Sequence, residues 1–253
     1  MRKTRRVMTY LICLILLVLL GPLAAIAIGI APVRGDWATA THDVVGIAPN
    51  PATTPEAIVQ VYAARAFSWR GAFAVHTWIA VKAEGAGTFT TYEVIGWRHY
   101  RGQSPVAVRQ KPPDTEWFGS APVILAELRG TEAAAAIPMI ERAVADYPHD
   151  NFYRTWPGPN SHTFTAHVAR AVPALRLDLP PTAVGKDYLG NGDMVAATPS
   201  GTGYQLSLGG VFGFLAGIEE GLEVTVLGLG IGVDPLDLKL RLPGLGRVGF
   251  GGD

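Results

Sequence analysis

The longest hydrophobic run of the chain lies at its N-terminus. Residues 7–33 carry no charge, and about 20 apolar residues are enough for a helix to cross the hydrocarbon core of a bilayer. The run follows four basic residues, Arg2, Lys3, Arg5 and Arg6. Basic residues before such a segment favour a cytoplasmic N-terminus. We therefore expect a single-pass protein of the cell inner membrane, held by this helix, with its globular part on the periplasmic or extracytoplasmic side.

The same run leaves open whether the membrane segment is an uncleaved anchor or a cleaved signal. Gly21 and Pro22 break the leucine-rich stretch, and residues 25–27 and 38–40 both have the small-x-small pattern of a cleavage site. The apolar stretch nevertheless continues to Val33, which is long for a signal peptide. Both alternatives place the globular part outside the cytoplasmic membrane.

Beyond the membrane segment, the polar and apolar pattern first predicts strands. Prolines punctuate residues 34–55, which we expect to form a linker or an edge segment. Runs rich in β-branched and aromatic residues then predict four strands, at residues 58–64, 73–82, 89–97 and 106–110. A glycine-containing turn at residues 84–87 should join the second and third strands into a hairpin.

Two helices are expected next. Thr131 is a favourable N-cap for a helix that continues to about Asp146, and Pro138 should kink this helix or mark a restart. A second helix is predicted over residues 161–172. Its apolar residues recur every four positions on one face, at Phe164, Val168 and Val172.

The composition changes after Pro180 and Pro181. The following residues are rich in glycine and predict strands at 203–208, 222–227 and 236–242. We therefore expect an α+β protein in four parts. These are a membrane segment (1–33), a linker (34–55), an α+β core (56–184) and a β-rich extension (185–253).

Charge and cysteine content restrict the possible functions. Without the four N-terminal basic residues the chain has 17 basic and 21 acidic residues, which argues against a nucleic-acid partner. Cys13, inside the membrane segment, is the only cysteine, so disulfides within the chain, cysteine metal sites and a cysteine nucleophile in the globular part are all excluded. The histidines and carboxylates show no metal-ligand spacing, and we expect no metal and no cofactor.

The candidate chemistry centres on a histidine and a serine. Ser161 opens the second predicted helix, where free N–H groups and the helix dipole can assist a nucleophile and an oxyanion. The alternative is that Asn160 or Ser161 simply caps the helix. His76, on an apolar strand, is the candidate general base, and its alternative is a hydrogen-bonded structural histidine. His162 and His167 are rival bases that we expect to be structural.

Further residues could complete such a site. Glu93, on the strand expected to pair with that of His76, is the best carboxylate to orient the imidazole, unless it forms an exposed cross-strand pair. Trp156 adjoins the Asn160 and Ser161 pair and is the strongest candidate to contact a ligand. Asn160 and Trp78 are further substrate-binding candidates, although most aromatic residues of this kind belong to a core.

Several segments together resemble an uncharacterised bacterial envelope family, domain of unknown function 3750. They are residues 73–97, 156–164, 185–188 and 242–246. The resemblance extends over nearly all of the chain after the membrane segment. It implies no established activity.

More distantly, the histidine and Asn-Ser motifs are similar to the permuted branch of the NlpC/P60 and papain-like superfamily. Its members carry a histidine on an early strand and an Asn-Cys motif opening a later helix, and act as thiol peptidases, amidases or acyltransferases. The resemblance implies an antiparallel papain-like sheet with packed helices. It also implies His76 as base, Glu93 as its orienter and Ser161 at the nucleophile position.

The departure from that superfamily is chemical. A cysteine beside a histidine can become a thiolate because its pKa is about 8.5, whereas a serine must lose its proton during attack. Three hypotheses follow. The chain is a hydrolase of amide or ester bonds in cell-envelope material, a non-catalytic domain that binds an envelope peptide, glycan or lipid, or a purely structural membrane-anchored protein.

Overall fold

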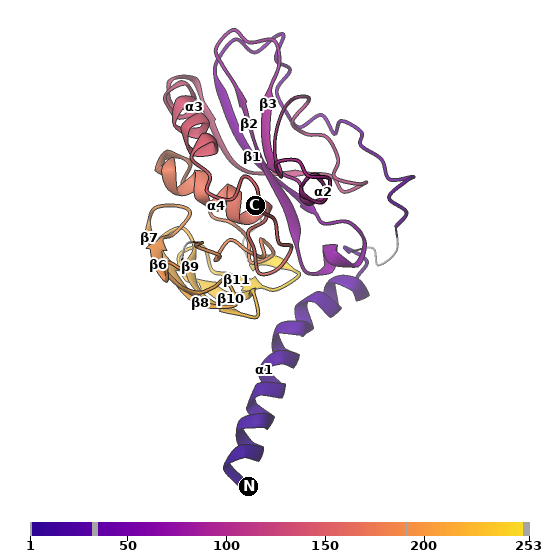
Figure 1. The fold of residues 1–253 in the computed structure, drawn as a ribbon, viewed down its shortest axis with the longest axis vertical. Coiled ribbons are helices and arrows are strands. Elements are labelled where there is room, and N and C mark those ends of the chain that lie inside the picture. Colours follow the sequence, from indigo (N-terminus) through magenta and orange to yellow (C-terminus); the bar gives the residue numbers. More distant parts are fainter. Residues whose placement is uncertain (1, 32–34, 191, 250–253) are drawn as a thin grey trace.

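A computed structural model describes residues 2–31, 35–190 and 192–249 of the chain (Figure 1). The described residues form a mixed helix and sheet structure with two antiparallel sheets, in agreement with the α+β prediction. The first sheet and its helices form the upper part of the view. The second sheet lies below them, and one long helix leaves the molecule at the bottom.

The N-terminal helix, α1 (Arg2–Ala27), contains the apolar segment Met8–Ala27, whose mean hydropathy is 2.7. By length and composition this segment can cross a membrane. Most of its described side chains are exposed. The exceptions lie toward its C-terminal end, where Val18, Gly21, Pro22 and Ala25 are buried against the folded part.

The first sheet has the strand order β4-β3-β2-β1-β5, and every pair of neighbours is antiparallel. Its strands are β1 (Ile58–Arg65), β2 (Val75–Lys82), β3 (Thr90–Val94), β4 (Val106–Gln110) and β5 (Val123–Arg129). The expected hairpin is present, because β2 pairs with β3. The order places β1 and β2 at the centre, and both are almost entirely buried.

Two helices cover one face of this sheet. They are α3 (Gly130–Ala145) and α4 (Ser161–Ala171), which pack on alternate residues of β1 and β2 such as Val61 and Ile79. α3 continues without interruption through Pro138, so the expectation of a restart there is wrong. Its neighbours Ile137 and Ile140 are buried in the core, and this burial holds the helix together across the proline.

The opposite face of the sheet carries a second, smaller core. Tyr62 and Trp78 stack there with ring centroids 5.5 Å apart. The loop after β4 covers them, and Pro113 accepts a hydrogen bond of 2.8 Å from the Trp78 indole. The expected linker is tied to this loop, because the Asp114 carboxylate accepts hydrogen bonds from the Gly46 and Ala48 amides.

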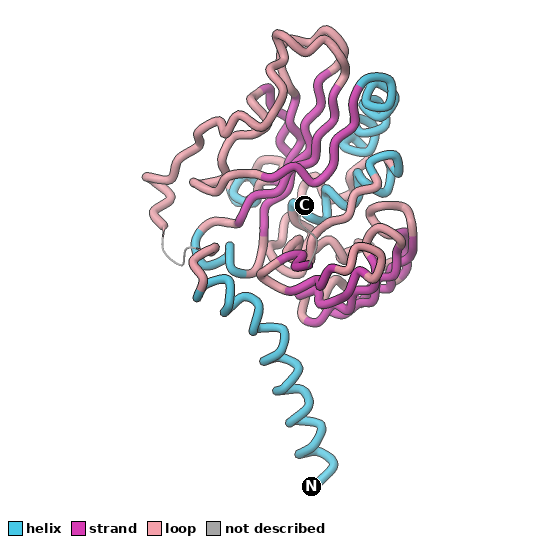
Figure 2. The backbone as a smooth tube through the Cα atoms, turned by 180° about the vertical axis from the view of Figure 1, so that it is seen from behind, coloured by secondary structure: helices cyan, strands magenta, loops and turns pink. Residues whose placement is uncertain are grey.

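The C-terminal part forms a seven-stranded antiparallel sheet in which every strand pairs with its neighbours in sequence. The strands are β6 (Val195–Ala197), β7 (Gly203–Leu208), β8 (Phe212–Gly217), β9 (Gly221–Val226), β10 (Leu229–Asp234), β11 (Lys239–Leu242) and β12 (Gly246–Gly249). Figure 2 shows the strands side by side at the lower end of the globular part. The β-rich extension therefore forms one sheet next to α4.

Several expected boundaries change in the structure. The third predicted strand ends at Val94, and Gly96–Tyr100 forms a short helix, α2. The strand expected from residue 236 begins only at Lys239, because the Asp234 side chain accepts hydrogen bonds from the Leu236 and Asp237 amides in a turn. Strands β5, β6, β8, β10 and β12 and the 3-10 turns Ser68–Ala72 and Pro173–Leu175 were not predicted.

Candidate active site

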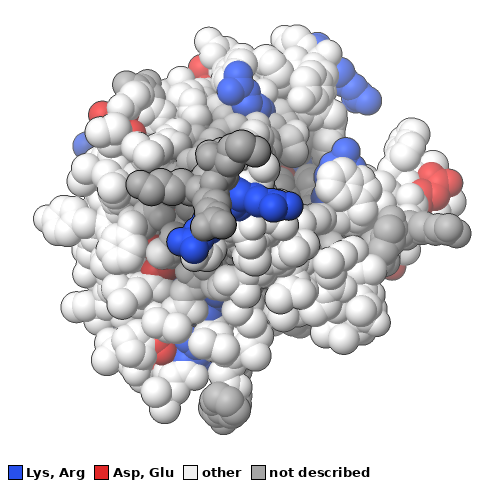
Figure 3. All heavy atoms as spheres, turned by 90° about the horizontal axis from the view of Figure 1, so that it is seen from below, with Lys and Arg blue, Asp and Glu red and all other residues white. Residues whose placement is uncertain are grey.

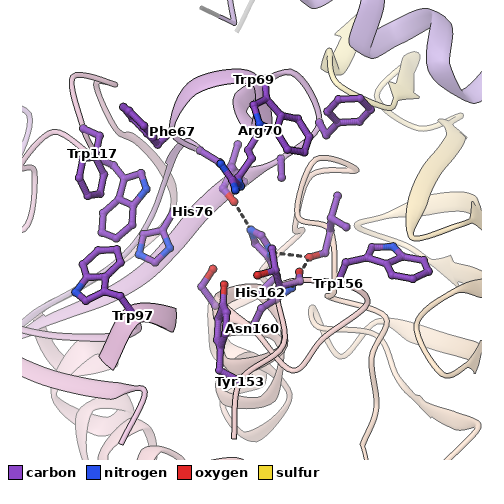
Figure 4. Close-up of a pocket in the computed structure, with 18 of the residues that line it drawn as sticks. Phe67, Trp69, Arg70, His76, Trp97, Trp117, Tyr153, Trp156, Asn160 and His162 are labelled. Carbon is purple, nitrogen blue, oxygen red and sulfur yellow. Dashed lines mark hydrogen bonds between the residues drawn. The ribbon is translucent and has the colours of Figure 1, made fainter. Parts of the chain in front are cut away.

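A pocket of about 610 Å³ lies where β2 begins and α4 begins. Its wall includes His76, Asn160, Ser161 and Trp156, four of the six residues singled out from the sequence. Figure 4 shows that His76 lies beside Trp97 and Trp117, with His162 and Asn160 on another part of the wall. The pocket thus brings together two motifs that are far apart in the chain.

His76 and Glu93 form the polar centre of one wall. The His76 Nε2 atom lies 3.2 Å from Glu93 Oε2, and both side chains are buried. Glu93 is also paired with Arg109 and with Lys111, whose Nζ lies 3.2 Å from Oε1. Two cations and an imidazole therefore surround one buried carboxylate.

These contacts determine the charge of both groups. Burial alone would raise the pKa of Glu93, but the His76 hydrogen bond and the charges of His76, Lys111 and Arg109 bring it well below its usual range. Burial lowers the pKa of His76, against the opposing effect of Glu93. Because an ionised carboxylate only accepts hydrogen bonds, Nε2 of a neutral His76 carries the proton. Nδ1 is then left with the lone pair that a general base needs.

Aromatic rings fix the plane of this imidazole. His76 stacks on Trp117 with ring centroids 3.6 Å apart and planes at 16°. Trp97 also stacks on Trp117, with ring centroids 5.7 Å apart. Trp97 and Trp117 both line the pocket, so the imidazole is held between Glu93 and a wall of indoles.

Trp78 does not fulfil its expected role. It is 2% exposed, lies in the core behind His76 and does not belong to the pocket wall. Trp78 was predicted to contact a ligand, but in the structure it is a core residue. Its indole N–H donates a hydrogen bond to the Pro113 carbonyl, so this polar group has a partner inside the core.

Asn160 is the N-cap of α4. Its side-chain Oδ1 accepts hydrogen bonds from the backbone N–H groups of His162 and Thr163. Its backbone N–H donates a hydrogen bond to Thr163 Oγ1. Its Nδ2 donates to the carbonyls of Thr155 and Val184. All polar atoms of the Asn160 side chain are engaged, so the structure assigns it to positioning the helix rather than to holding a ligand.

Because Asn160 is the cap, Ser161 is not. Among the residues that the structure describes, the Ser161 hydroxyl has no hydrogen-bond partner, and neither does its backbone N–H. The first N–H groups of a helix lack partners within the helix, and the Asn160 cap takes those of the two following residues. Ser161 therefore combines a free hydroxyl and a free amide at the positive end of a helix.

His76 and Ser161 line the same pocket but are not joined by a hydrogen bond within the described part of the chain. Thr77 faces α4, where its hydroxyl lies 3.3 Å from the Ser161 carbonyl. Side chains alternate along a strand, so His76 points to the other side of β2. The two residues share a pocket because it opens at the end of the strand.

The rings of the two rival histidines, His162 and His167, contact backbone carbonyls. The ring nitrogens of His162 face the carbonyls of Val75 and Val184. Burial lowers the pKa of His162 to about 4. His167 contacts the Ala143 carbonyl at 3.0 Å. Both are structural, as expected from the sequence.

Trp156 joins the pocket to the second sheet. Its indole donates a 2.9 Å hydrogen bond to the Leu227 carbonyl, and its ring is 48% exposed. Leu227 and Leu229, at the turn between β9 and β10, also line the pocket. The C-terminal extension therefore contributes directly to the candidate site, which the sequence did not indicate.

The pocket wall also contains residues that sequence reasoning missed. Arg70 is exposed at the pocket and, among the described residues, pairs with no carboxylate. Phe67, Trp69 and Phe73 come from the segment before β2, and Trp37 comes from the expected linker. Their aromatic character was visible in the sequence, but nothing local placed them beside His76. Within the described ranges, no group of three His, Cys, Asp or Glu residues could hold a metal ion.

Comparison with known proteins agrees with the first of the two resemblances found in the sequence, over part of the residues that carry it. A family model described as "Protein of unknown function (DUF3750)" matches residues 56–188, slightly more than half of the chain. The chain belongs to the DUF3750 family. A search of curated proteins and a search of solved structures give no match.

The family match covers most but not all of the candidate site of this DUF3750 chain. The matched residues contain His76, Glu93 and Ser161 together with the first sheet and its helices. The N-terminal helix and the seven-stranded sheet lie outside the match. Since the family description gives no activity, a function has to be argued from the pocket itself.

Proposed function

We propose that this DUF3750 chain is a membrane-anchored envelope hydrolase or acyltransferase that attacks amide or ester bonds with a permuted papain-like site. His76 is the general base, Glu93 orients it, and Ser161 occupies the nucleophile position. The observation that carries the proposal is that one pocket is lined by a Glu93-bound imidazole and by the Ser161 hydroxyl, which has no hydrogen-bond partner among the described residues.

Each group has a step in this mechanism. His76 Nδ1 removes the proton from Ser161 Oγ as the oxygen attacks the carbonyl carbon of the substrate. Glu93 keeps the proton on Nε2 and stabilises the imidazolium that forms. The free N–H of Ser161 donates to the oxyanion. His76 then protonates the leaving alcohol or amine, and water or another acceptor releases the acyl group from Ser161.

The proton transfer sets a geometric requirement. Base and nucleophile must come within about 3 Å, directly or through one water molecule, in the substrate complex. Both side chains line one pocket. The proposal requires that a rotation of the Ser161 side chain, or a bridging water, supply the contact in the substrate complex.

The pocket wall favours an apolar acyl group as the substrate part that binds. Indole and phenyl rings from residues 67, 69, 73, 97 and 117 line it. Burial of such surface stabilises a bound acyl chain by about 25 cal/mol per Å². Arg70 adds a cation at the pocket that suits a substrate carrying an anionic group.

The test is ester hydrolysis by the full chain in detergent. We would measure the cleavage of p-nitrophenyl esters of increasing acyl length by wild type, Ser161→Ala and His76→Ala. The expected result is a loss of roughly 100-fold or more in kcat/KM for both variants, with little change in KM. His167→Ala, a change in the same helix away from the pocket, is the matched control and should retain activity. Equal rates in all four proteins would refute the proposal.

A second candidate function is supported by a different observation. His76 and Ser161 are not hydrogen-bonded, while stacked indoles dominate the wall beside them. This arrangement suits a domain that binds an envelope glycan, peptide or lipid without cleaving it. Binding that survives Ser161→Ala and His76→Ala but is lost in Trp97→Ala would favour this alternative.

A further inference from the structure

The seven-stranded sheet has its apolar face outside and its polar face inside. Along β7, Gln205 and Ser207 are buried, whereas Tyr204, Leu206 and Leu208 are exposed. The same inversion occurs on β9, where Glu223 is buried between exposed Leu222 and Val224. A sheet in contact with water on one side normally shows the opposite alternation.

Strand register joins these exposed residues into continuous rows. One row crosses the sheet at Tyr204, Ala216, Leu222, Val233, Leu240 and Val248. A second row runs through Val195, Leu206, Phe214, Val224 and Ile231. We call these two rows the outer face. Phe214, Leu222 and Val224 near its centre are each 46–47% exposed.

Buried ion pairs lock the sheet in this orientation. On its inner face, Arg241 Nη1 lies 2.7 Å from Asp178 and Arg241 Nε lies 2.8 Å from Glu223, both carboxylates being buried. Lys186 Nζ lies 2.5 Å from the other Glu223 oxygen. Separating such pairs would leave uncompensated charges at a cost of several kcal/mol. The sheet therefore cannot turn its apolar face inward to relieve its exposure.

The membrane helix lies against this same face. By strand alternation, Val226 and Leu229 belong to the side of the sheet that carries the outer face, and they are buried because Val18 of α1 packs on them. Gly21 continues the contact, since a Cβ there would lie 1.9 Å from the Pro243 carbonyl oxygen. The candidate membrane span and the exposed apolar rows are thus neighbours on one surface.

The position of Val18 fixes how far the helix can project. Val18 lies in the middle of the apolar segment Met8–Ala27. At a rise of about 1.5 Å per residue, the free part from Met8 to Leu17 is roughly 15 Å long. The hydrocarbon core is about 30 Å thick. The free part alone is therefore too short to cross the core, and the folded part next to Val18 has to enter the membrane with α1 for the helix to span it.

The charge distribution agrees with that placement. Figure 3 views the molecule from the side on which α1 leaves it, and uncharged residues make up most of the visible surface. The outer-face rows contain no charged residue. Because every inner strand is hydrogen-bonded on both sides, β7 to β11 can present side chains to lipid without exposing unpaired backbone groups.

We propose that the outer face of the C-terminal sheet lies in the bilayer that α1 enters, in contact with the acyl chains. The sheet acts as a second, monotopic membrane contact beside the transmembrane helix. It holds the pocket close to the lipid surface, since Leu229 contacts both Val18 and the pocket. The proposal does not depend on catalysis by Ser161.

Site-specific fluorescence in vesicles tests this placement. The full chain with Cys13→Ala would carry a single new cysteine, labelled with an environment-sensitive fluorophore, by Phe214→Cys or Val224→Cys. Val108→Cys is the matched control, because Val108 is an exposed strand residue of the first sheet. The labelled proteins would be reconstituted into phosphatidylethanolamine and phosphatidylglycerol vesicles containing brominated acyl chains.

The proposal expects the labels at 214 and 224 to be quenched by the brominated lipid and protected from aqueous iodide, with the reverse at 108. Iodide quenching of all three labels, with no effect of bromine, would overturn it. Protection of the two outer-face labels from both quenchers, with disulfide cross-linking of unlabelled Phe214→Cys between chains, would overturn it in favour of a second copy on this face. The circular dichroism of each variant checks that the fold is retained.

Discussion

His76 on β2 and Glu93 on the neighbouring β3 are in contact, although they are not cross-strand partners. The cross-strand partner of Glu93 is Trp78, two residues further along β2, yet the His76 imidazole reaches diagonally to the carboxylate at 3.2 Å. Diagonal neighbours on one face of a sheet lie within reach of long and aromatic side chains. The indole of Trp117, stacked on the face of the imidazole, keeps it in that diagonal position.

Glu93→Gln should destabilise the protein strongly. The change removes a buried charge that is paired with His76, Arg109 and Lys111. Breaking a buried ion pair costs roughly 3–5 kcal/mol. The free energy of unfolding would be measured with denaturant, with Glu84→Gln at an exposed turn as the matched control. Similar losses in both variants would mean that the pairing contributes nothing to stability.

The same substitution should also shift the titration of His76. Glu93 opposes the lowering of the His76 pKa by burial, so its removal should lower that pKa further. NMR titration of the His76 imidazole signals would measure the change. A higher pKa in Glu93→Gln would contradict the electrostatic role assigned to the carboxylate.

Stability should fall as the pH drops from 7 toward 5. Burial lowers the pKa values of four histidines, His76, His149, His162 and His167. Below about pH 6.5 the unfolded chain therefore binds more protons than the folded one, so the free energy of unfolding decreases with falling pH. The stabilisation that these neutral histidines provide is complete above that pH. It is lost as the pH falls toward their lowered pKa values in the folded protein.

His162→Gln should reduce this pH dependence. The folded pKa of His162 is about 4 against an ordinary value of 6.5, a difference that is equivalent to roughly 3 kcal/mol when the pH has fallen to 4. We would compare the slope of unfolding free energy against pH between 7 and 5 in wild type and variant. His42→Gln, which changes an exposed histidine, is the control. An unchanged slope in His162→Gln would show that His162 does not titrate as described.

Ser161→Cys should create a reactive thiol. The position offers a free N–H and the positive end of α4, both of which favour a thiolate and lower the pKa of a cysteine. In a Cys13→Ala background, the rate of iodoacetamide alkylation should exceed that of Ser104→Cys, an exposed loop position, at pH 7. A slower or equal rate, with the fold intact, would indicate that the helix end does not activate a nucleophile.

Gly21→Val should separate α1 from the second sheet. A Cβ at this position would lie 1.9 Å from the Pro243 carbonyl oxygen, and overpacking of this kind costs about 1–3 kcal/mol. We expect faster proteolysis of the segment after α1 and a lower melting temperature in detergent. Gly87→Val is the control, since a Cβ there has open space. If both variants behave as wild type, the packing of α1 on the sheet is absent in solution.

Local pattern alone was sufficient for much of the core. The strands at 58–64 and 106–110 and the helix at 161–172 agree with β1, β4 and α4 within one residue at each end. Each has strong periodicity and clear end signals, such as the Asn160 cap. The strand at 123–129 escaped prediction because it lies at a sheet edge, where only Leu128 is fully buried.

Short β-strands of the second sheet were harder to predict. They alternate in the usual way, but glycines interrupt β8 and β10, and the turns between strands are only a few residues long. The pattern also could not reveal which side of the sheet is buried. The inner face is chosen by the ion pairs of Arg241 and Lys186 with residues that lie far away in the chain.

The sequence by itself determined the apolar N-terminal helix, the α+β class and the residue types from which a site could be built, because these depend on periodicity and composition over short distances. Only the tertiary structure decided that Glu93 reaches His76, that Asn160 rather than Ser161 caps the helix, and that Trp78 lies in the core. These depend on strand register and on side-chain direction, and they join residues as far apart as Trp78 and Pro113. A one-residue change of register would reverse the face of each side chain, so no local pattern could specify them.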